Sequence, residues 1–160
     1  IFMKSLKNKS TLGPAETIFL GLKNFNFNKT AIVANHDQYI NFEFPSMNYD
    51  AFMPIYFNNT KDSSYVKIRN NHILSIAEKK RISFYASSGI YGFKNLTSLK
   101  TILKKALKSK PNHKNEFYVG PSINFLIKKN KKVIPTKTNF KFDLGSPKGI
   151  GYFKKFLKNF

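Results

Sequence analysis

The sequence has no cysteine, few acidic residues and no long apolar run. Without cysteine, the 160-residue chain cannot form disulfides, thiolate nucleophiles or cysteine-based zinc sites, and this composition suits a reducing compartment. No apolar stretch approaches the roughly 20 residues that a membrane-spanning helix needs. Lys4, Lys7 and Lys9 interrupt the start of the chain, so the apolar core of a signal peptide is missing as well. These absences predict a soluble, cytoplasmic protein without a membrane partner.

Two common catalytic motifs are also absent. The chain has no Gly-x-x-x-x-Gly-Lys-Ser/Thr loop, which excludes a P-loop, and no Gly-x-Ser-x-Gly turn, which excludes an α/β-hydrolase. No two of its three histidines have a spacing suited to binding one metal ion. His36 stands beside Asp37, and a role in acid–base chemistry is open there next to a purely structural one.

The strong positive charge favours anionic ligands without choosing among them. The chain carries 28 Lys and Arg against 8 Asp and Glu, which gives a formal net charge of +20. Nucleic acid is one candidate ligand, because basic side chains pair with phosphates. Only Arg69 and Arg81 are arginine, however, and arginine supplies the bidentate contacts typical of base recognition. A genome rich in A and T explains the abundance of lysine, and the shortage of arginine disfavours nucleic acid.

Strand-like and helix-like segments alternate along the chain. Gly13 and Pro14 open a helix with Glu16 in its first turn, and apolar spacing indicates another helix over 97–107. We expect further helices over 122–129 and 148–160, and strands over 30–34, 53–57, 65–68, 73–77, 89–93 and 132–135. This alternation predicts an α/β layered fold in a single domain over residues 1–160.

Two aspartates stand where predicted strands end. Asp37 comes soon after the apolar run 31–34, and Asp143 follows the strand-like run 140–142 before a tight turn. Ligands of open α/β sheets bind at strand ends, and two aspartates there suit one magnesium ion. The alternative is that each aspartate only caps a turn, as aspartate commonly does.

A second candidate region runs from Glu78 to Gly89. Glu78 stands beside Lys79 and Lys80 just before a loop, and Gly89 follows a pair of serines. A glycine there lets a ligand or a backbone segment come close, because it lacks a Cβ. The alternatives are a solvated run of charges for the first segment and a tight bend for the second.

Several short segments occur together in the order and spacing of a known family. They are Thr11–Thr17, Ala31–Gln38, Ser64–Ile68, Ile76–Lys80, Ala86–Tyr91, Glu116–Val119 and Phe142–Pro147. Together they resemble the sugar-phosphate nucleotidyltransferases of the glucose-1-phosphate thymidylyltransferase type. These enzymes join a nucleoside triphosphate to a sugar 1-phosphate and release pyrophosphate. The resemblance implies a Rossmann-like mixed sheet flanked by helices.

The resemblance also implies roles for individual residues. Asp37 and Asp143 correspond to residues that hold Mg²⁺, and Lys79 to one that neutralises the phosphate of the acceptor. The substrate-binding residues that it implies are Gly13, Pro14, Glu78, Gly89, Tyr91 and Glu116. A sugar 1-phosphate is the default acceptor, although related enzymes also activate phosphocholine and other small phosphorylated compounds. The product is expected to serve as a precursor of surface polysaccharide or capsule.

One part of the family pattern has no counterpart in the sequence. The family begins with a strand and a glycine-rich loop that carries an arginine, followed by a lysine, and these groups hold the triphosphate. The resemblance therefore implies an incomplete domain with weak or no activity by itself. The alternatives are a fragment, the product of a split or decayed gene, or half of a two-chain assembly with a separate N-terminal chain as partner. His36 also stands where many relatives carry a small residue. A non-catalytic, decayed or regulatory relative and a basic nucleic-acid-binding module are the alternative functions.

Overall fold

The computed structural model describes residues 10–25, 28–45, 48–60, 62–111 and 113–159. The expectations for Lys4, Lys7 and Lys9, and for Phe160 at the end of the last helix, lie outside these residues. The helices are α1 (Pro14–Gly21), α2 (Leu96–Ala106), α3 (Val119–Ser122), α4 (Asn124–Ile127) and α5 (Pro147–Leu157). The strands are β1 (Ala31–Ala34), β2 (Gln38–Phe42), β3 (Ala51–Phe57), β4 (Ser64–Arg69), β5 (His72–Glu78), β6 (Tyr85–Ser87), β7 (Ile90–Phe93) and β8 (Val133–Asp143).

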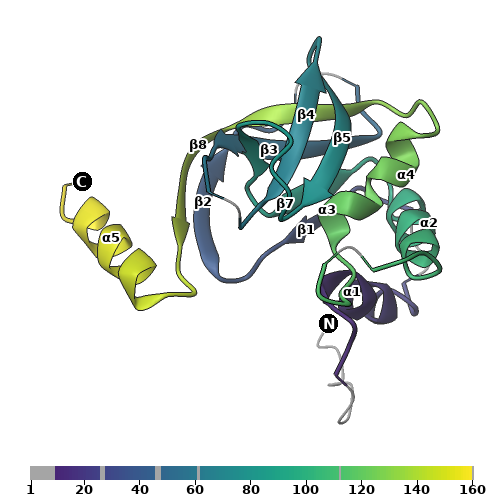
Figure 1. Cartoon of the computed structure of the whole chain (residues 1–160), viewed down its shortest axis with the longest axis horizontal. Helices are drawn as coiled ribbons and strands as arrows, with labels where there is room; N and C mark the ends of the chain where they lie inside the picture. Colours follow the sequence, from purple (N-terminus) through teal and green to yellow (C-terminus); the bar gives the residue numbers. More distant parts are fainter. Residues whose placement is uncertain (1–9, 26–27, 46–47, 61, 112, 160) are drawn as a thin grey trace.

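The described strands form one open, mostly antiparallel sheet (Figure 1). Strand β3 pairs in parallel with β8 on one side. On its other side it pairs antiparallel with β7 near its start and with β6 near its end. Strand β1 pairs with β7, and β4 pairs with both β6 and β5. The tight β4–β5 turn has positive φ angles at Asn70 (48°) and Asn71 (58°), as hairpin turns of this kind require. The α/β fold with a mixed sheet is confirmed.

Strand β8 is long and pairs with two different strands. Its first half, from Val133 to Lys137, runs parallel to β3. Its second half, ending at Asp143, runs antiparallel to β2, and the two form an arm that leaves the main body (Figure 1). Because β2 begins at Gln38, this pairing brings the end of β8 beside the β1–β2 connection.

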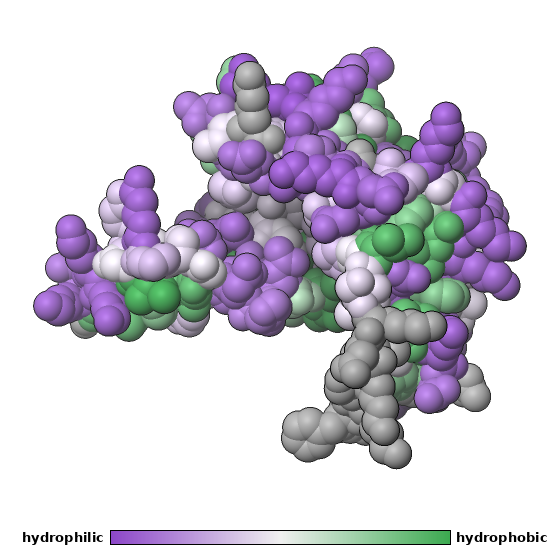
Figure 2. All heavy atoms as spheres, turned by 60° about the horizontal axis from the view of Figure 1, so that its bottom comes forward, coloured by the Kyte–Doolittle hydropathy of each residue, from purple (hydrophilic) through white to green (hydrophobic). Residues whose placement is uncertain are grey.

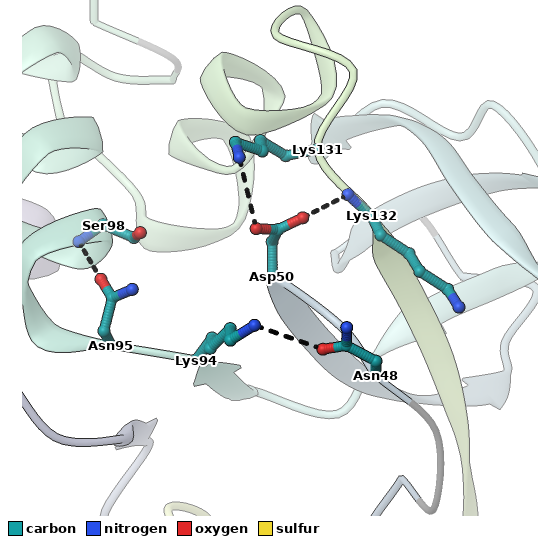
Figure 3. Close-up of polar contacts among 7 residues, drawn as sticks. All are labelled: Asn48, Asp50, Lys94, Asn95, Ser98, Lys131 and Lys132. Atoms are coloured by element: carbon teal, nitrogen blue, oxygen red, sulfur yellow. Dashed lines mark hydrogen bonds and ion pairs between the residues drawn. The ribbon is translucent and has the colours of Figure 1, made fainter.

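Helices α1 to α4 share one hydrophobic core with the sheet. The apolar face of α2 supplies Leu99, Ile102 and Leu103, each at most 2% exposed, as the sequence spacing predicts. Asn95 caps this helix by accepting a hydrogen bond from the Ser98 backbone N–H at 2.8 Å (Figure 3). These helices therefore pack on the sheet through one common core.

Asp50 connects three strands at one end of the sheet (Figure 3). Its carboxylate accepts a hydrogen bond from the Lys132 backbone N–H at 2.8 Å and lies 3.7 Å from the Lys131 ammonium. Its own backbone N–H donates to the Lys132 carbonyl at 2.8 Å, and its carbonyl accepts from the Lys94 N–H at 2.9 Å. Asp50 thus fixes the start of β8 against the start of β3 and the end of β7.

Three parts of the chain differ from the sequence-based expectation. Strands β2 and β6 were not expected, because β2 is half exposed and β6 has three residues, so neither carries a strong local pattern. The helix expected over 122–129 is two short helices, α3 and α4, and the Asn124 side chain bonds the Ile76 N–H and carbonyl on β5. The strand expected over 132–135 continues to Asp143, because β2 gives its second half a partner.

Helix α5 packs on the arm rather than on the main body (Figure 1). Rings of Phe153 and Phe156 contact those of Phe140 and Phe142, with centroids 4.8 to 5.4 Å apart. Figure 2 shows apolar side chains gathered along one side of this helix. Leu157, the last residue of the helix, is 53% exposed. None of the helices described is both long enough and apolar enough to span a membrane.

Replacing Asp50 is expected to destabilise the sheet. The substitution Asp50→Ala leaves the Lys132 N–H without its acceptor, so the free energy of unfolding should fall by about 1–3 kcal/mol in urea titrations. The matched control is Glu43→Ala, which removes an exposed carboxylate 3.8 Å from Lys137. It should cost at most about 1 kcal/mol. Equal losses in the two variants would contradict the role of Asp50.

Candidate active site

The carboxylates of Asp37 and Asp143 face the same point. Asp37 lies in the β1–β2 connection, Asp143 ends β8, and Gln38 stands opposite Asp143 in the β2–β8 ladder. The Leu144 N–H donates to the Asp37 carbonyl at 2.8 Å and holds the two segments together. A Cβ built on Gly145 would lie 3.0 Å from Asp37 Oδ2 and 3.3 Å from Asp143 Oδ1. The fold thus brings together two aspartates that stand far apart in the sequence.

Asp143 also caps a turn, as the alternative interpretation of the sequence had it. Its Oδ1 accepts the Gly145 N–H at 2.9 Å, and its Oδ2 accepts the Ser146 hydroxyl at 3.1 Å. Ser146 in turn caps α5 by accepting the Gly149 N–H at 3.1 Å. A carboxylate oxygen has a second lone pair, so these bonds orient Asp143 without using up its acceptor capacity.

The aspartate pair fits a hard divalent cation. Magnesium is commonly bound by one or two carboxylates and completes its shell with water and substrate phosphates. The space over Gly145, which a side chain there would fill, lies between the two carboxylates. Within the described ranges, no three His, Cys, Asp or Glu residues cluster as a metal site would require, so a closed all-protein site is not formed there. Two carboxylates are a donor set that suits Mg²⁺, which takes its remaining ligands from water or substrate oxygens.

A polar pocket of about 170 Å³ lies where β6 and β7 are interrupted, at Ser88 and Gly89. It brings together three of the residues predicted to bind substrate, Glu78, Gly89 and Tyr91. The Ser88 hydroxyl oxygen is buried there, and none of the described residues partners it. Ser88 belongs to the pocket lining, and a buried hydroxyl that lacks a partner among the described residues is a group that a ligand can satisfy.

Glu78 and Tyr91 lie in an environment that disfavours their charged forms. The Ser64 hydroxyl, opposite Glu78 in the β4–β5 ladder, donates to Glu78 Oε2. Burial nevertheless raises the pKa of Glu78, against the lowering effects of this bond and of the charges on Lys79 and His113. Burial also raises the pKa of Tyr91, and the nearby Glu78 charge adds to that effect. Glu78 is thus not the solvated charge of the alternative interpretation.

Gly89 is placed against the protein's own side chains. Its φ of +87° lies in the region that glycine favours, and a Cβ there would be 2.6 Å from Asn35 Nδ2. The Asn35 backbone N–H also donates to the Gly89 carbonyl at 3.0 Å. The close approach expected from the sequence is therefore that of Asn35, which lines the pocket two residues before Asp37.

Gly13, Pro14 and Glu116 form a separate group at the start of α1. Gly13 has a φ of +100°, and a Cβ there would lie 2.8 Å from the Phe117 carbonyl oxygen. The Glu116 carboxylate accepts the Tyr118 hydroxyl at 2.5 Å, and burial followed by this bond raises the pKa of Tyr118 to about 12. None of the three predicted residues lines the pocket that contains Glu78.

Lys79 lies beside the pocket but does not line it. It follows β5 with a φ of +48°, its N–H donates to the Ser63 carbonyl at 3.0 Å, and its side chain is exposed. Its charge lowers the pKa of Glu78, so the two groups interact. Of the histidines, His36 is exposed next to Asp37, and His72 Nδ1 lies 2.7 Å from the Asn70 carbonyl oxygen.

Sequence reasoning missed two residues that connect the pocket to the aspartate pair. Asn35 stands two residues before Asp37, and Lys141 stands two residues before Asp143; both line the pocket. Alternation along a strand places Lys141 and Asp143 on the same face of β8. The two-residue spacing of Lys141 and Asp143 is present in the sequence, but it indicates a shared face only once β8 is known to pair with β2 there.

The raised pKa of Glu78 predicts a pH-dependent stability. The folded protein holds the Glu78 proton more tightly than the unfolded chain does, so this stabilisation is full below the ordinary pKa of 4.5. This stabilisation is lost as the pH rises through the pKa that Glu78 has in the folded protein. Glu78→Gln stays neutral and still accepts from Ser64, so its Tm should rise relative to the unsubstituted protein from about pH 4 to about pH 7. If the Tm difference between Glu78→Gln and the unsubstituted protein did not change with pH and equalled that of the exposed control Glu43→Gln, the predicted role of the Glu78 proton would be contradicted.

The chain resembles solved nucleotidyltransferase structures in its fold. The nucleoside-diphosphate-sugar pyrophosphorylase from Vibrio cholerae RC9 superposes with a TM-score of 0.81 at 24% identity, over 91% of this chain and 66% of that one. A UDP-glucose pyrophosphorylase superposes with a TM-score of 0.68 at 18% identity, over 92% of this chain and 62% of that one. The inositol-1-phosphate CTP transferase from T. maritima superposes with a TM-score of 0.63 at 14% identity, over 86% of this chain and 58% of that one.

These likenesses concern the fold, since sequence comparison finds no match. No protein-family model matches the chain, and no curated protein matches it significantly. The chain spans 58% to 66% of the length of the structures just named. It has the fold of the sugar nucleotidyltransferases.

Proposed function

We propose that this chain belongs to a nucleotidyltransferase that joins a nucleoside triphosphate to a sugar 1-phosphate or a similar small phosphorylated acceptor. The observation that carries the proposal is the convergence of Asp37 and Asp143 beside a polar pocket. The likeness to sugar nucleotidyltransferases supports it at the level of the fold. The reaction product, an activated sugar, would serve the synthesis of surface polysaccharide.

The proposed reaction is an in-line displacement. A phosphate oxygen of the acceptor attacks the α-phosphorus of the triphosphate, and the bond to pyrophosphate breaks. No general base is needed, because a phosphate oxygen is already ionised at neutral pH. The work of the protein is to position two anions and to reduce their repulsion.

Asp37 and Asp143 are the residues that would hold Mg²⁺. When bound, the ion would supply positive charge between the two phosphate groups. The hydrogen bonds from Gly145 and Ser146 hold the Asp143 carboxylate in one orientation toward Asp37. This preorganisation lowers the cost of bringing two carboxylates together at the site.

Glu78 and Lys79 are assigned to the acceptor. In its ionised form the Glu78 carboxylate accepts hydrogen bonds from substrate hydroxyls, with Ser64 fixing its orientation. Lys79, whose exposed side chain is free to turn toward the pocket mouth, neutralises the attacking phosphate. Gly13, Pro14 and Glu116, in their separate group, are assigned to the nucleotide side.

Neutralising either aspartate is expected to weaken magnesium-dependent nucleotide binding. Asp37→Asn and Asp143→Asn should each lower the affinity for a fluorescent nucleoside triphosphate in Mg²⁺ by roughly tenfold or more, with little change in EDTA. Binding is the first readout because the chain spans 58% to 66% of the similar structures. The matched control Glu43→Gln removes an exposed acid and should bind as the unsubstituted protein does.

Two outcomes would contradict the proposal. Nucleotide binding that is unaffected in both aspartate variants would remove the metal assignment. Binding of RNA or DNA that weakens steeply with salt, with no response to free nucleotide, would favour the nucleic-acid-binding alternative.

Removing the charge of Lys79 is expected to weaken acceptor binding. Lys79→Asn is the suitable variant, because asparagine tolerates the positive φ of this position better than alanine does. The Kd for glucose 1-phosphate should rise by about tenfold, since one charge-assisted contact is lost. Calorimetry measures it, with the neighbouring exposed Lys80→Asn as control. An unchanged Kd would exclude Lys79 from the acceptor site.

A further inference from the structure

Lys141 places an ammonium group inside the pocket. It lies on β8 opposite Ile40 of β2, is half-buried, and its Nζ is 5.3 Å from the centre of the Tyr56 ring on β3. A cation over a tyrosine face is held there by the ring quadrupole. The side chain is therefore directed across the pocket.

Among the described residues, no carboxylate forms an ion pair with the Lys141 ammonium. Ion pairs among the described residues join Lys131 to Asp50 and Lys137 to Glu43, and neither involves Lys141. Asp62 and Glu78 also line the pocket, but Asp62 is exposed to solvent and Glu78 is bonded to Ser64. A half-buried ammonium without a paired acid favours an anionic ligand group.

The pocket has two chemically different sides. Lys141 is on β8, next to the aspartate pair, whereas Ser64 and Glu78 are on β4 and β5. Strands β3 and β6 lie between β8 and β4 in the sheet, so the two sides are separated. Hydroxyl and carboxylate groups on one side and an ammonium on the other suit a ligand with hydroxyls at one end and an anion at the other.

We infer that Lys141 is a further substrate-binding residue, which holds the phosphate group of the acceptor. The inference rests on the proposed function and specifies how the acceptor is oriented in the pocket. The phosphate points toward Lys141 and the aspartate pair, and the hydroxyls point toward Glu78 and Ser64. In this orientation the attacking phosphate oxygen lies on the side where the triphosphate is bound.

Ser88 adds a polar group for the rest of the acceptor. Its hydroxyl is buried and has no partner among the described residues, and Ser88 belongs to the pocket lining, so an acceptor hydroxyl can satisfy it.

The test compares a phosphorylated compound with its unphosphorylated counterpart in two matched variants. Calorimetry at fixed ionic strength measures the Kd of glucose 1-phosphate and of glucose. Lys141→Gln should raise the Kd of glucose 1-phosphate by about tenfold, because one charge-assisted contact to the phosphate is lost. Lys141→Arg keeps the charge and should retain the affinity. The control Lys137→Gln, an equal charge change on an exposed residue of β8, should leave this affinity unchanged.

The outcomes separate this inference from the proposed function. No binding of glucose 1-phosphate, equal affinity for glucose 1-phosphate and glucose, or equal effects of Lys141→Gln and Lys137→Gln would each overturn the role of Lys141. If the aspartate variants still lose magnesium-dependent nucleotide binding, the proposed function stands without it. If only the Lys141 effects are found, the pocket is a phosphate site selected by Lys141, and nucleotidyl transfer is overturned.

Discussion

The double pairing of β8 is the constraint on which the site depends. One continuous strand is bound in parallel to β3 at its start and antiparallel to β2 at its end. Asp50 fixes the first pairing through the Lys132 backbone. The register of the second determines that Asp143 arrives opposite Gln38, and hence beside Asp37. A slip of one residue in either pairing would turn Asp143 and Lys141 to the other face of the strand.

Four of the acidic residues of this basic chain are held in defined positions by the fold. Asp50 accepts from the backbone, Asp37 and Asp143 converge on one point, and Glu78 is held by Ser64 within the pocket. With a formal net charge of +20, the surrounding field favours anions throughout. Local geometry, and not the total charge, then decides where an anion can be bound in a fixed orientation.

The core and the pocket use different parts of the sheet. Helices α1 to α4 bury the apolar face, which gives a rigid body with Leu99, Ile102 and Leu103 at its centre. The pocket lies at Ser88 and Gly89, where the chain passes from β6 to β7 alongside β3, and polar groups line it. Function and stability therefore depend on largely separate residues, apart from the partly buried Glu78.

The sequence by itself determined the local elements with strong periodicity, the α/β class and the resemblance that named Asp37 and Asp143. Pro14 at the start of α1 and the apolar spacing of α2 are local signals, and local interactions produced those helices. The half-exposed β2, the length of β8, the convergence of the two aspartates and the inward direction of Lys141 were decided by tertiary structure alone. Each depends on pairing between segments about a hundred residues apart, such as Asn41 and Asn139, whose side chains are bonded at 2.7 Å. Neither segment by itself indicates its partner, because the energy of such a pairing exists only once both segments are in place.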